Sequence, residues 1–227
     1  HVAEAKRGHR EAYGRIGDVL QELGNPTVLA LTATANDEVT RDIMRILRID
    51  ALLIDRTQRA NLCLDDKSNL KSRDDYLASL VATGEKCIIY VNSREQSVVV
   101  ARSLRKRVPQ LGLSIGFYNA ALSREERKRI EGLFRNDVFS VLVATSAFGE
   151  GVNIPDVRHV VLYHLPFNEI EFNQMSGRAG RDGKPAFIHL LYGRNDARMN
   201  ERILSGMTPS RDEMADVYRL LRRLWRE

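Results

Sequence analysis

From residue 61 onwards, short apolar runs alternate with segments whose apolar positions recur at helical spacing. Short continuous apolar runs are typical of buried strands. They predict strands at 61–64, 87–91, 113–118, 139–144, 159–163 and 187–192. The patterns between them predict helices near 72–83, 94–107, 124–135 and 169–178. This regular alternation predicts an α/β fold, in which a mainly parallel sheet is covered by helices on both faces.

Residues 1–50 have a different order of elements. A helical pattern within 1–24 ends at a Gly-Asn-Pro turn, the apolar run 28–31 predicts a strand, and Asn36 or Asp37 can cap a following helix. Because one strand cannot form a sheet of its own, we interpret these elements as the end of a preceding domain. The predicted organisation is a remnant of that domain at 1–50, a linker at 51–60, a second domain at 61–192 and a helical extension at 193–227.

Several predicted helix starts carry a Ser followed three residues later by Gln or Glu. This spacing lets side chains and free backbone amides exchange hydrogen bonds. The pairs are Ser93 with Gln96, Ser123 with Glu126, and Ser210 with Glu213. The last pair begins a predicted helix over 210–226, whose apolar stripe includes Met214, Val217, Tyr218 and Leu221. That stripe either packs against the core or leads into a further domain.

The composition is that of an ordinary globular chain. Of the 227 residues, 43% are hydrophobic and 29% are charged, and the net charge is +5. This mild basicity favours a polyanionic partner only weakly, and a solvated surface accounts for it better. No apolar run approaches the roughly 18 residues of a membrane span. Cys63 and Cys87 lack zinc-ligand spacing and form no disulfide framework, so the expected location is the reducing cytoplasm.

The stretch 174–183 reads Gln-Met-Ser-Gly-Arg-Ala-Gly-Arg-Asp-Gly. Arg178 and Arg181 each follow a glycine and are three residues apart, so on a helix they would share one face. A guanidinium group keeps its charge and matches phosphate oxygens with a planar fork of donors. The pair therefore suits a transferring γ-phosphate; the alternative is a solvated surface turn.

A second segment carries ligand-binding features. The apolar run 141–144 predicts a buried strand, and Thr-Ser-Ala-Phe-Gly-Glu-Gly-Val-Asn-Ile-Pro follows over 145–155. Open α/β sheets bind ligands at the carboxyl ends of their strands, where such hydroxyls and glycines would lie.

These two segments, in this order, resemble motifs V and VI of superfamily 2 helicases, in the variant of the RecQ-like branch. Leu-Thr-Ala-Thr-Ala over 31–35 resembles motif III, and Cys-Ile-Ile-Tyr-Val-Asn-Ser-Arg over 87–94 resembles motif IV. The resemblance implies a RecA-like, three-layer α/β/α domain with a helical C-terminal extension. It also implies the second motor domain of an ATP-dependent DNA helicase with roles in DNA repair and recombination.

The resemblance further implies a role for each motif residue. Arg178 and Arg181 would be arginine fingers that reach the γ-phosphate, and Gln174 would help to place them. Residues that would frame the nucleotide are Gly149, Gly151, Asn153, Gly177 and Gly180. Residues that would contact DNA phosphates are Asn92, Ser93, Arg94, Asn119 and Thr145. Thr32 and Thr34 would couple the ATP state to domain movement.

Structural alternatives exist for several of these residues. Thr32 and Thr34 could end a strand and cap a helix, and Arg94 could be a first-turn surface residue. Asn153 could be a turn residue, and Gln174 an ordinary exposed helix residue.

The sequence departs from the RecQ pattern at several places. Tyr-Asn-Ala-Ala over 118–121 replaces the usual Tyr-His-Ala-Gly, which puts a DNA contact by Asn119 in doubt. Glu150 stands where RecQ proteins often have Met, and the zinc-binding cysteines that typically follow motif VI are absent, so no zinc or other metal ligand set is expected. These departures indicate a divergent relative or a fusion with another activity.

Two parts of a helicase motor are missing from this sequence. It has no Gly-x-x-x-x-Gly-Lys-Ser/Thr phosphate loop and no acidic metal-binding pair after a strand. We therefore expect ATP and Mg²⁺ to be held in the complete protein mostly by the missing first RecA-like domain, and this chain to be inactive alone. Other expected partners are single-stranded or partly duplex DNA, with no membrane.

Two alternatives to a DNA helicase motor remain. One is a nucleic-acid-binding or coupling module of a larger DNA repair protein, such as a nuclease fusion, without motor activity. The other is an RNA helicase of the DEAD-box branch, which ranks lower because its motif VI begins His-Arg instead of Gln174-Met175.

Overall fold

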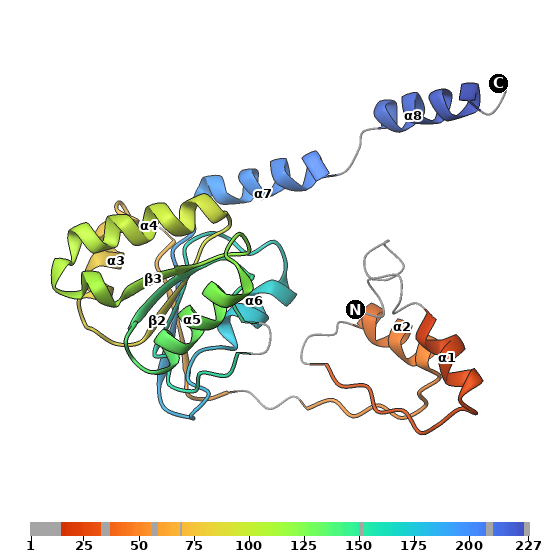
Figure 1. The fold of residues 1–227 in the computed structure, drawn as a ribbon, viewed down its shortest axis with the longest axis horizontal. Coiled ribbons are helices and arrows are strands. Elements are labelled where there is room, and N and C mark those ends of the chain that lie inside the picture. The colour runs from red at the N-terminus through yellow and green to blue at the C-terminus, as the bar shows by residue number, and fades with distance from the viewer. Residues whose placement is uncertain are drawn as a thin grey trace. The chain divides into compact units, whose positions relative to one another are not determined.

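The computed structural model describes residues 15–32, 37–55, 59–68, 70–149, 152–207 and 211–224. The chain divides into two compact units, His1–Arg59 and Ala60–Glu227. The point of division falls within the segment predicted as a linker. Figure 1 shows the helices and strands of both units.

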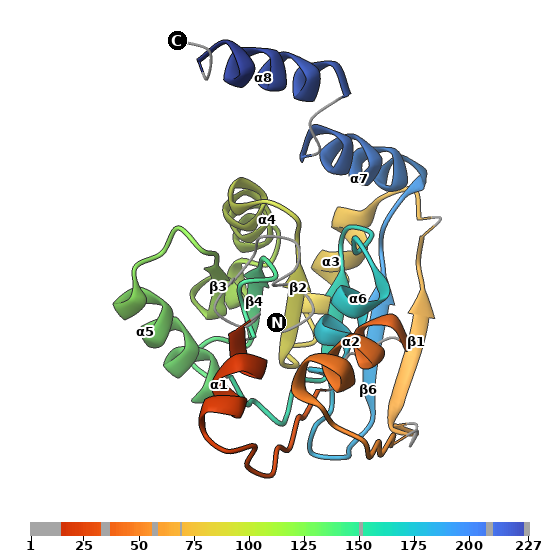
Figure 2. The ribbon, with the colours of Figure 1, turned by 90° about the vertical axis from the view of Figure 1, so that its right-hand side faces the viewer.

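A six-stranded sheet, parallel throughout, forms the centre of the second unit. Its spatial order is β1-β6-β5-β2-β4-β3, and Figure 2 shows β1 and β6 together at one edge. The strands are β1 (Leu62–Asp66), β2 (Cys87–Tyr90), β3 (Ile115–Tyr118), β4 (Val141–Ala144), β5 (His159–Leu162) and β6 (Ala186–Leu190). β3 begins later than predicted because a 3₁₀ helix, η3 (Pro109–Ser114), precedes it and places a proline in its first turn.

Helices cover both faces of this sheet, which confirms the predicted three-layer α/β/α fold. One face packs against α3 (Arg73–Val81) and α4 (Arg94–Arg107). The other packs against α5 (Arg124–Arg135) and α6 (Glu169–Ser176). Every residue of β2, β4 and β5 is buried, because a strand with helices on both faces has no side exposed to water.

An aromatic cluster joins α5 to the loop after β4. Phe134 is fully buried and meets Phe148 edge to face, with ring centroids 5.9 Å apart. Phe148 in turn meets Tyr118 at the end of β3, at 5.0 Å. Edge-to-face aromatic pairs add about 0.5–1.5 kcal/mol beyond the burial of their area. The start of the loop after β4 is therefore anchored in the core.

The predicted helix caps are found where the structure describes them. The Ser93 hydroxyl accepts a hydrogen bond from the Gln96 amide at 3.0 Å. Ser123 and Glu126 form a complete capping box at the start of α5. Ser210 lies outside the described residues.

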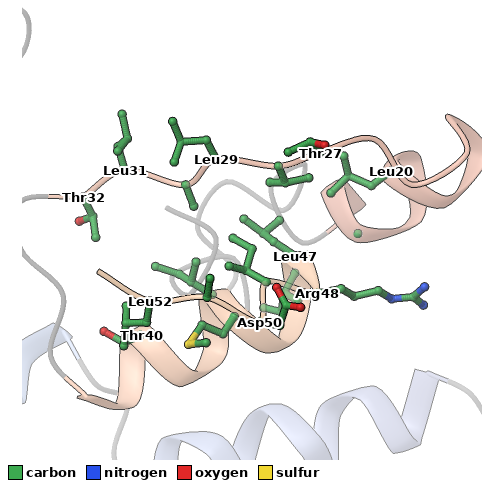
Figure 3. Close-up of a pocket in the computed structure, with 18 of the residues that line it drawn as sticks. Leu20, Thr27, Leu29, Leu31, Thr32, Thr40, Leu47, Arg48, Asp50 and Leu52 are labelled. Carbon is green, nitrogen blue, oxygen red and sulfur yellow. The ribbon is translucent and has the colours of Figure 1, made fainter. Parts of the chain in front are cut away.

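The first unit contains α1 (Ile16–Glu22) and α2 (Asp37–Leu47). The strand predicted at 28–31 is wrong: these residues pair with no neighbour among the described residues, and a strand requires a partner for its backbone groups. Leu29 and Leu31 are 80% and 84% exposed. Together with residues from both helices they line an open hollow of about 840 Å³, shown in Figure 3. The unit therefore leaves apolar side chains uncovered on this face.

Two helices follow the sheet, α7 (Arg194–Met207) and α8 (Arg211–Leu224). The middle of α7 is held by Asn200, whose side-chain amide donates to the Leu165 carbonyl at 2.8 Å. The apolar stripe of α8 is exposed, since Met214, Val217, Tyr218 and Leu221 are between 57% and 65% accessible. That exposure disfavours packing of the stripe against the core. Among described residues, no helix combines the length and apolar character that a membrane crossing requires.

A chain of hydrogen bonds with a buried histidine pair at its centre lies beneath α3. His159 and His189, on neighbouring strands, are 3.0 Å apart between Nδ1 and Nε2. His159 Nε2 contacts Glu85 at 2.8 Å, and His189 Nδ1 contacts the Tyr76 hydroxyl at 2.9 Å. Burial, followed by the neighbouring His159, lowers the pKa of His189 from 6.5 to about 4. His189 is therefore neutral in the folded protein over the whole physiological range.

This depressed pKa predicts an acid-sensitive stability. Between pH 6.5 and about 4 the unfolded chain takes up a proton that the folded His189 resists, so stability is lost as the pH falls through this window. At pH 5 this effect lowers the free energy of unfolding by about 2 kcal/mol relative to its value at neutral pH. Replacing His189 with Gln should remove that part of the pH dependence, measured by urea unfolding at pH 7 and pH 5. If the free energy of unfolding of the variant falls between pH 7 and pH 5 by as much as that of the wild type, this account is contradicted.

Candidate functional site

The two arginines of the 174–183 stretch lie in turns after a helix, not on it. α6 (Glu169–Ser176) is capped by Asn168, whose side chain accepts from the Glu171 amide at 2.9 Å, and the helix ends at Ser176. The prediction of a helix through 178 is therefore wrong. Gly177 caps the helix, and Gly180 has a left-handed φ of 51° that an α-helix does not allow.

Both guanidinium groups converge on the loop after β4. Arg178 Nη1 donates to the Val152 carbonyl at 3.1 Å, and Arg181 Nη1 contacts the same oxygen at 3.4 Å. Arg181 Nη1 also donates to Asn153 Oδ1 at 3.2 Å, and its Nε donates to the Gly177 carbonyl. Two like charges thus share one carbonyl acceptor, and their fields add at this place.

Gly149 makes room for Arg178. Its φ is 137°, and a Cβ atom built on it would overlap the Arg178 guanidinium. A residue with a side chain would therefore displace the arginine. The glycine was predicted to face the nucleotide, whereas in the structure its immediate neighbour is the arginine.

Tyr90 lies behind the same arginine, at the end of β2. Its ring is buried, and its hydroxyl donates to the Phe148 carbonyl at 3.3 Å. Burial raises the pKa of Tyr90 to about 12, and the charge of Arg178 opposes that rise. The phenol is therefore neutral and keeps its proton for donation.

The residues expected to contact DNA lie at the carboxyl ends of β2 and β4. Asn92 and Arg94 are exposed, and Ser93 between them caps α4. Thr145 is half-buried, and its backbone amide donates to the Tyr118 carbonyl at 3.1 Å. β2 and β4 pair directly, so these residues occupy neighbouring positions where the two strands end.

Asn119 has a structural environment. Its side chain is 4% exposed, Nδ2 donates to the Ser97 hydroxyl at 2.9 Å, and Oδ1 accepts from the Ala121 amide at 3.0 Å. These bonds hold the turn between β3 and α5. The geometry lends no support to a phosphate contact by this residue, which stays a prediction.

The remaining predicted residues are dispersed. Gln174 is exposed on α6, and Thr32 is exposed in the first unit. Thr34 and Gly151 lie outside the described residues. The structure thus brings Arg178, Arg181, Gly149 and Asn153 together, and the coupling role of Thr32 stays a prediction.

Sequence reasoning missed three neighbours of the arginine pair: Asn61, Tyr90 and Arg158. Asn61 and Arg158 bond the segment that follows Arg178, from far away in the sequence. No periodicity or local motif marks them. Over the part of the chain that the structure describes, no group of three or more His, Cys, Asp or Glu residues is arranged to hold a metal ion.

Comparisons with known proteins agree with the fold and the motifs. Residues 72–183 match the family described as helicase conserved C-terminal domain. The probable ATP-dependent DNA helicase RecS of Bacillus subtilis is 32% identical over 225 residues, which are 97% of this chain and 45% of that protein. The ATP-dependent DNA helicase RecQ of Haemophilus influenzae is 34% identical over 202 residues, 87% of this chain and 32% of that protein. The chain thus spans less than half the length of these relatives.

Solved helicase structures share the fold. The helicase MrfA bound to DNA and AMPPNP has a TM-score of 0.65 at 17% identity, over 86% of this chain and 30% of that one. Saccharomyces cerevisiae Dbp5 L327V bound to RNA and ADP BeF3 has a TM-score of 0.64 at 22% identity, over 95% of this chain and 59% of that one. These likenesses confirm the RecA-like fold. The chain therefore contains the second RecA-like domain of a superfamily 2 helicase, and its homologues over most of its length are RecQ-family DNA helicases.

Proposed function

We propose that this domain supplies the arginine fingers and part of the DNA contact of an ATP-driven DNA helicase. The observation that carries the proposal is the convergence of Arg178 and Arg181 on the Val152 carbonyl. Two guanidinium groups that meet at one carbonyl concentrate N–H donors and positive charge at one place, which suits a phosphate group.

The arginines would act on charge that develops during phosphoryl transfer. The chemistry needs donors aimed at the γ-phosphate oxygens, and guanidinium groups fit these oxygens with paired N–H donors. Mg²⁺, when bound by the complete enzyme, would neutralise the β- and γ-phosphates. Arg178 and Arg181 would add the positive charge from this side, with Asn153 orienting Arg181. An arginine finger is worth about 10³–10⁵ in rate.

The proposed contact with DNA rests on the residues that follow the carboxyl ends of β2 and β4. The exposed Asn92 and Arg94 stand at the start of α4, where free backbone amides and the positive end of the helix favour phosphate. Thr145 lies at the end of the adjacent strand. Contacts of this kind hold a nucleic acid by its backbone and do not read its sequence.

Removing either finger should stop catalysis without abolishing ATP binding. In the full-length protein that contains this sequence, Arg178→Ala or Arg181→Ala should lower the DNA-stimulated ATPase kcat by about 10³-fold or more. ATP affinity should change little, because most of the nucleotide site is expected on the other domain. Arg107→Ala, which removes an exposed arginine at the end of α4, serves as the matched control and should behave as wild type.

Normal turnover in both arginine variants would remove them from the catalytic role. If neither variant nor the wild type turns over ATP while all bind DNA, the domain is a nucleic-acid-binding module without motor activity.

The DNA contact can be tested through salt dependence. Binding of single-stranded DNA should weaken as salt rises, and each lost phosphate contact should lower the log–log slope by about 0.7. Arg94→Ala should produce one such step. Lys106→Ala, on the same helix about three turns further along, should leave the slope unchanged. Equal slopes for Arg94→Ala and wild type would show that Arg94 is a surface residue away from the DNA.

A further inference from the structure

The 180–185 turn, which contains Arg181, folds around the side chain of Asn61. Asn61 Nδ2 donates to the Gly180 carbonyl and to the Lys184 carbonyl, both at 2.8 Å. A Cβ atom at Gly180 would lie 2.7 Å from this amide nitrogen and 2.8 Å from the Lys184 oxygen. One amide thus ties both ends of the turn together, and only glycine at 180 permits the approach.

Arg158 holds the same turn with two donors, and a third donor fixes its own side chain. Its Nη2 donates to Asp182 Oδ1 at 2.6 Å, its Nη1 to the Pro185 carbonyl at 2.8 Å, and its Nε to the Asp156 carbonyl at 3.1 Å. The side chains of Arg158 and Asp182 are only 17% and 21% exposed, so water screens this pair less than an open surface pair. The hydrogen bond from Arg158 is the main reason that the pKa of Asp182 is lowered.

Backbone bonds fix the positions on either side of Arg181. The Gly180 amide donates to the Val157 carbonyl at 2.8 Å, and the Asp182 amide donates to the Pro155 carbonyl at 3.1 Å. The acceptors belong to the segment that continues directly from Val152, on which both fingers converge. The backbone of Arg181 is therefore held from both sides against the loop that its own side chain contacts.

Arg158 also supplies the positive charge that pairs with the Asp182 carboxylate. Asp182 is the immediate neighbour of Arg181, and its carboxylate accepts from Arg158 and from the Lys184 amide. Without Arg158, that carboxylate would lose its hydrogen-bonded ion-pair partner, one residue away in sequence from Arg181. An ion pair between Asp182 and Arg181 would then compete with a phosphate for the finger.

We propose that Asn61 and Arg158 are positioning residues, which hold the 180–185 turn so that Arg181 and Arg178 stay aimed at the nucleotide. The hydrogen bonds of Asn61 and Arg158 go to the backbone of the turn and to Asp182, so both residues would act on the arginines indirectly. This inference rests on the proposed function of the arginine pair.

The test uses the full-length protein and compares turnover with binding. Asn61→Ala and Arg158→Ala should each lower the DNA-stimulated ATPase kcat by about 10- to 100-fold, since a displacement near 1 Å has effects of this size. The KM for ATP and the affinity for DNA should stay within about two-fold of wild type, because neither residue touches a ligand. The control is Asp75→Ala, which removes an ion pair of equal length, 2.6 Å, between α3 and α4.

A double variant separates positioning from simple structural support. Arg158→Ala with Asp182→Ala should recover about ten-fold in kcat over Arg158→Ala alone, because no released carboxylate then competes for Arg181. A kcat for the double variant equal to or below that of Arg158→Ala would overturn the role given to Arg158.

The outcomes also distinguish this inference from the proposed function. If Arg178→Ala and Arg181→Ala abolish turnover while Asn61→Ala and Arg158→Ala keep wild-type kcat, the positioning role is wrong and the fingers stand. If the finger variants turn over normally, both proposals fall. Should Asn61→Ala or Arg158→Ala not fold, Arg158→Lys replaces it, since lysine keeps the charge but not the planar fork. A wild-type kcat for Arg158→Lys would then overturn the inference, and a kcat about ten-fold lower with unchanged KM would support it.

Discussion

The site depends on one shared acceptor, the carbonyl of Val152, which brings two guanidinium groups to the same loop. Like charges at one neutral oxygen repel each other, so such an arrangement persists only where the surrounding structure enforces it. The enforcement here comes from the core. Phe148, Val152 and Ile154 are all buried, so the loop that offers the carbonyl cannot move away from the sheet without exposing apolar surface.

The same logic explains why the glycines of this region lie where they do. Gly149 leaves space for the Arg178 guanidinium, and Gly180 leaves space for the Asn61 amide. Each glycine has a positive φ and serves a contact inside the protein. Their place in the site is therefore indirect, because they make room for the contacts that position Arg178 and the turn of Arg181.

The sequence predicted the sheet well because its strands are buried on both faces. Continuous apolar runs such as 141–144 have only one good structural solution in a chain that alternates strand and helix. Prediction failed where local pattern and long-range contact disagree. The run 28–31 is as apolar as the true strands but finds no partner among the described residues, and α6 ends at Ser176 because the glycines that follow favour turns.

The arginine pair was predictable from a local motif, whereas Asn61 and Arg158 were not. Their contacts with the 180–185 turn depend on β1, β5 and β6 lying side by side, which no local signal encodes.

The way in which the charged side chains of residues 178–182 are paired bears on what the site is for. Stability alone would favour pairing the charges of 178–182 with one another, and Asp182 is the nearest carboxylate in sequence to Arg181. The structure instead pairs Asp182 with Arg158, while the Arg181 guanidinium donates to the Val152 carbonyl and to Asn153 Oδ1. A guanidinium group that is already oriented by hydrogen bonds to a loop suits a partner that arrives with negative charge, because less ordering remains to be done on binding. On the proposed function, the pairing of Asp182 with Arg158 would keep this carboxylate from competing with a phosphate for Arg181.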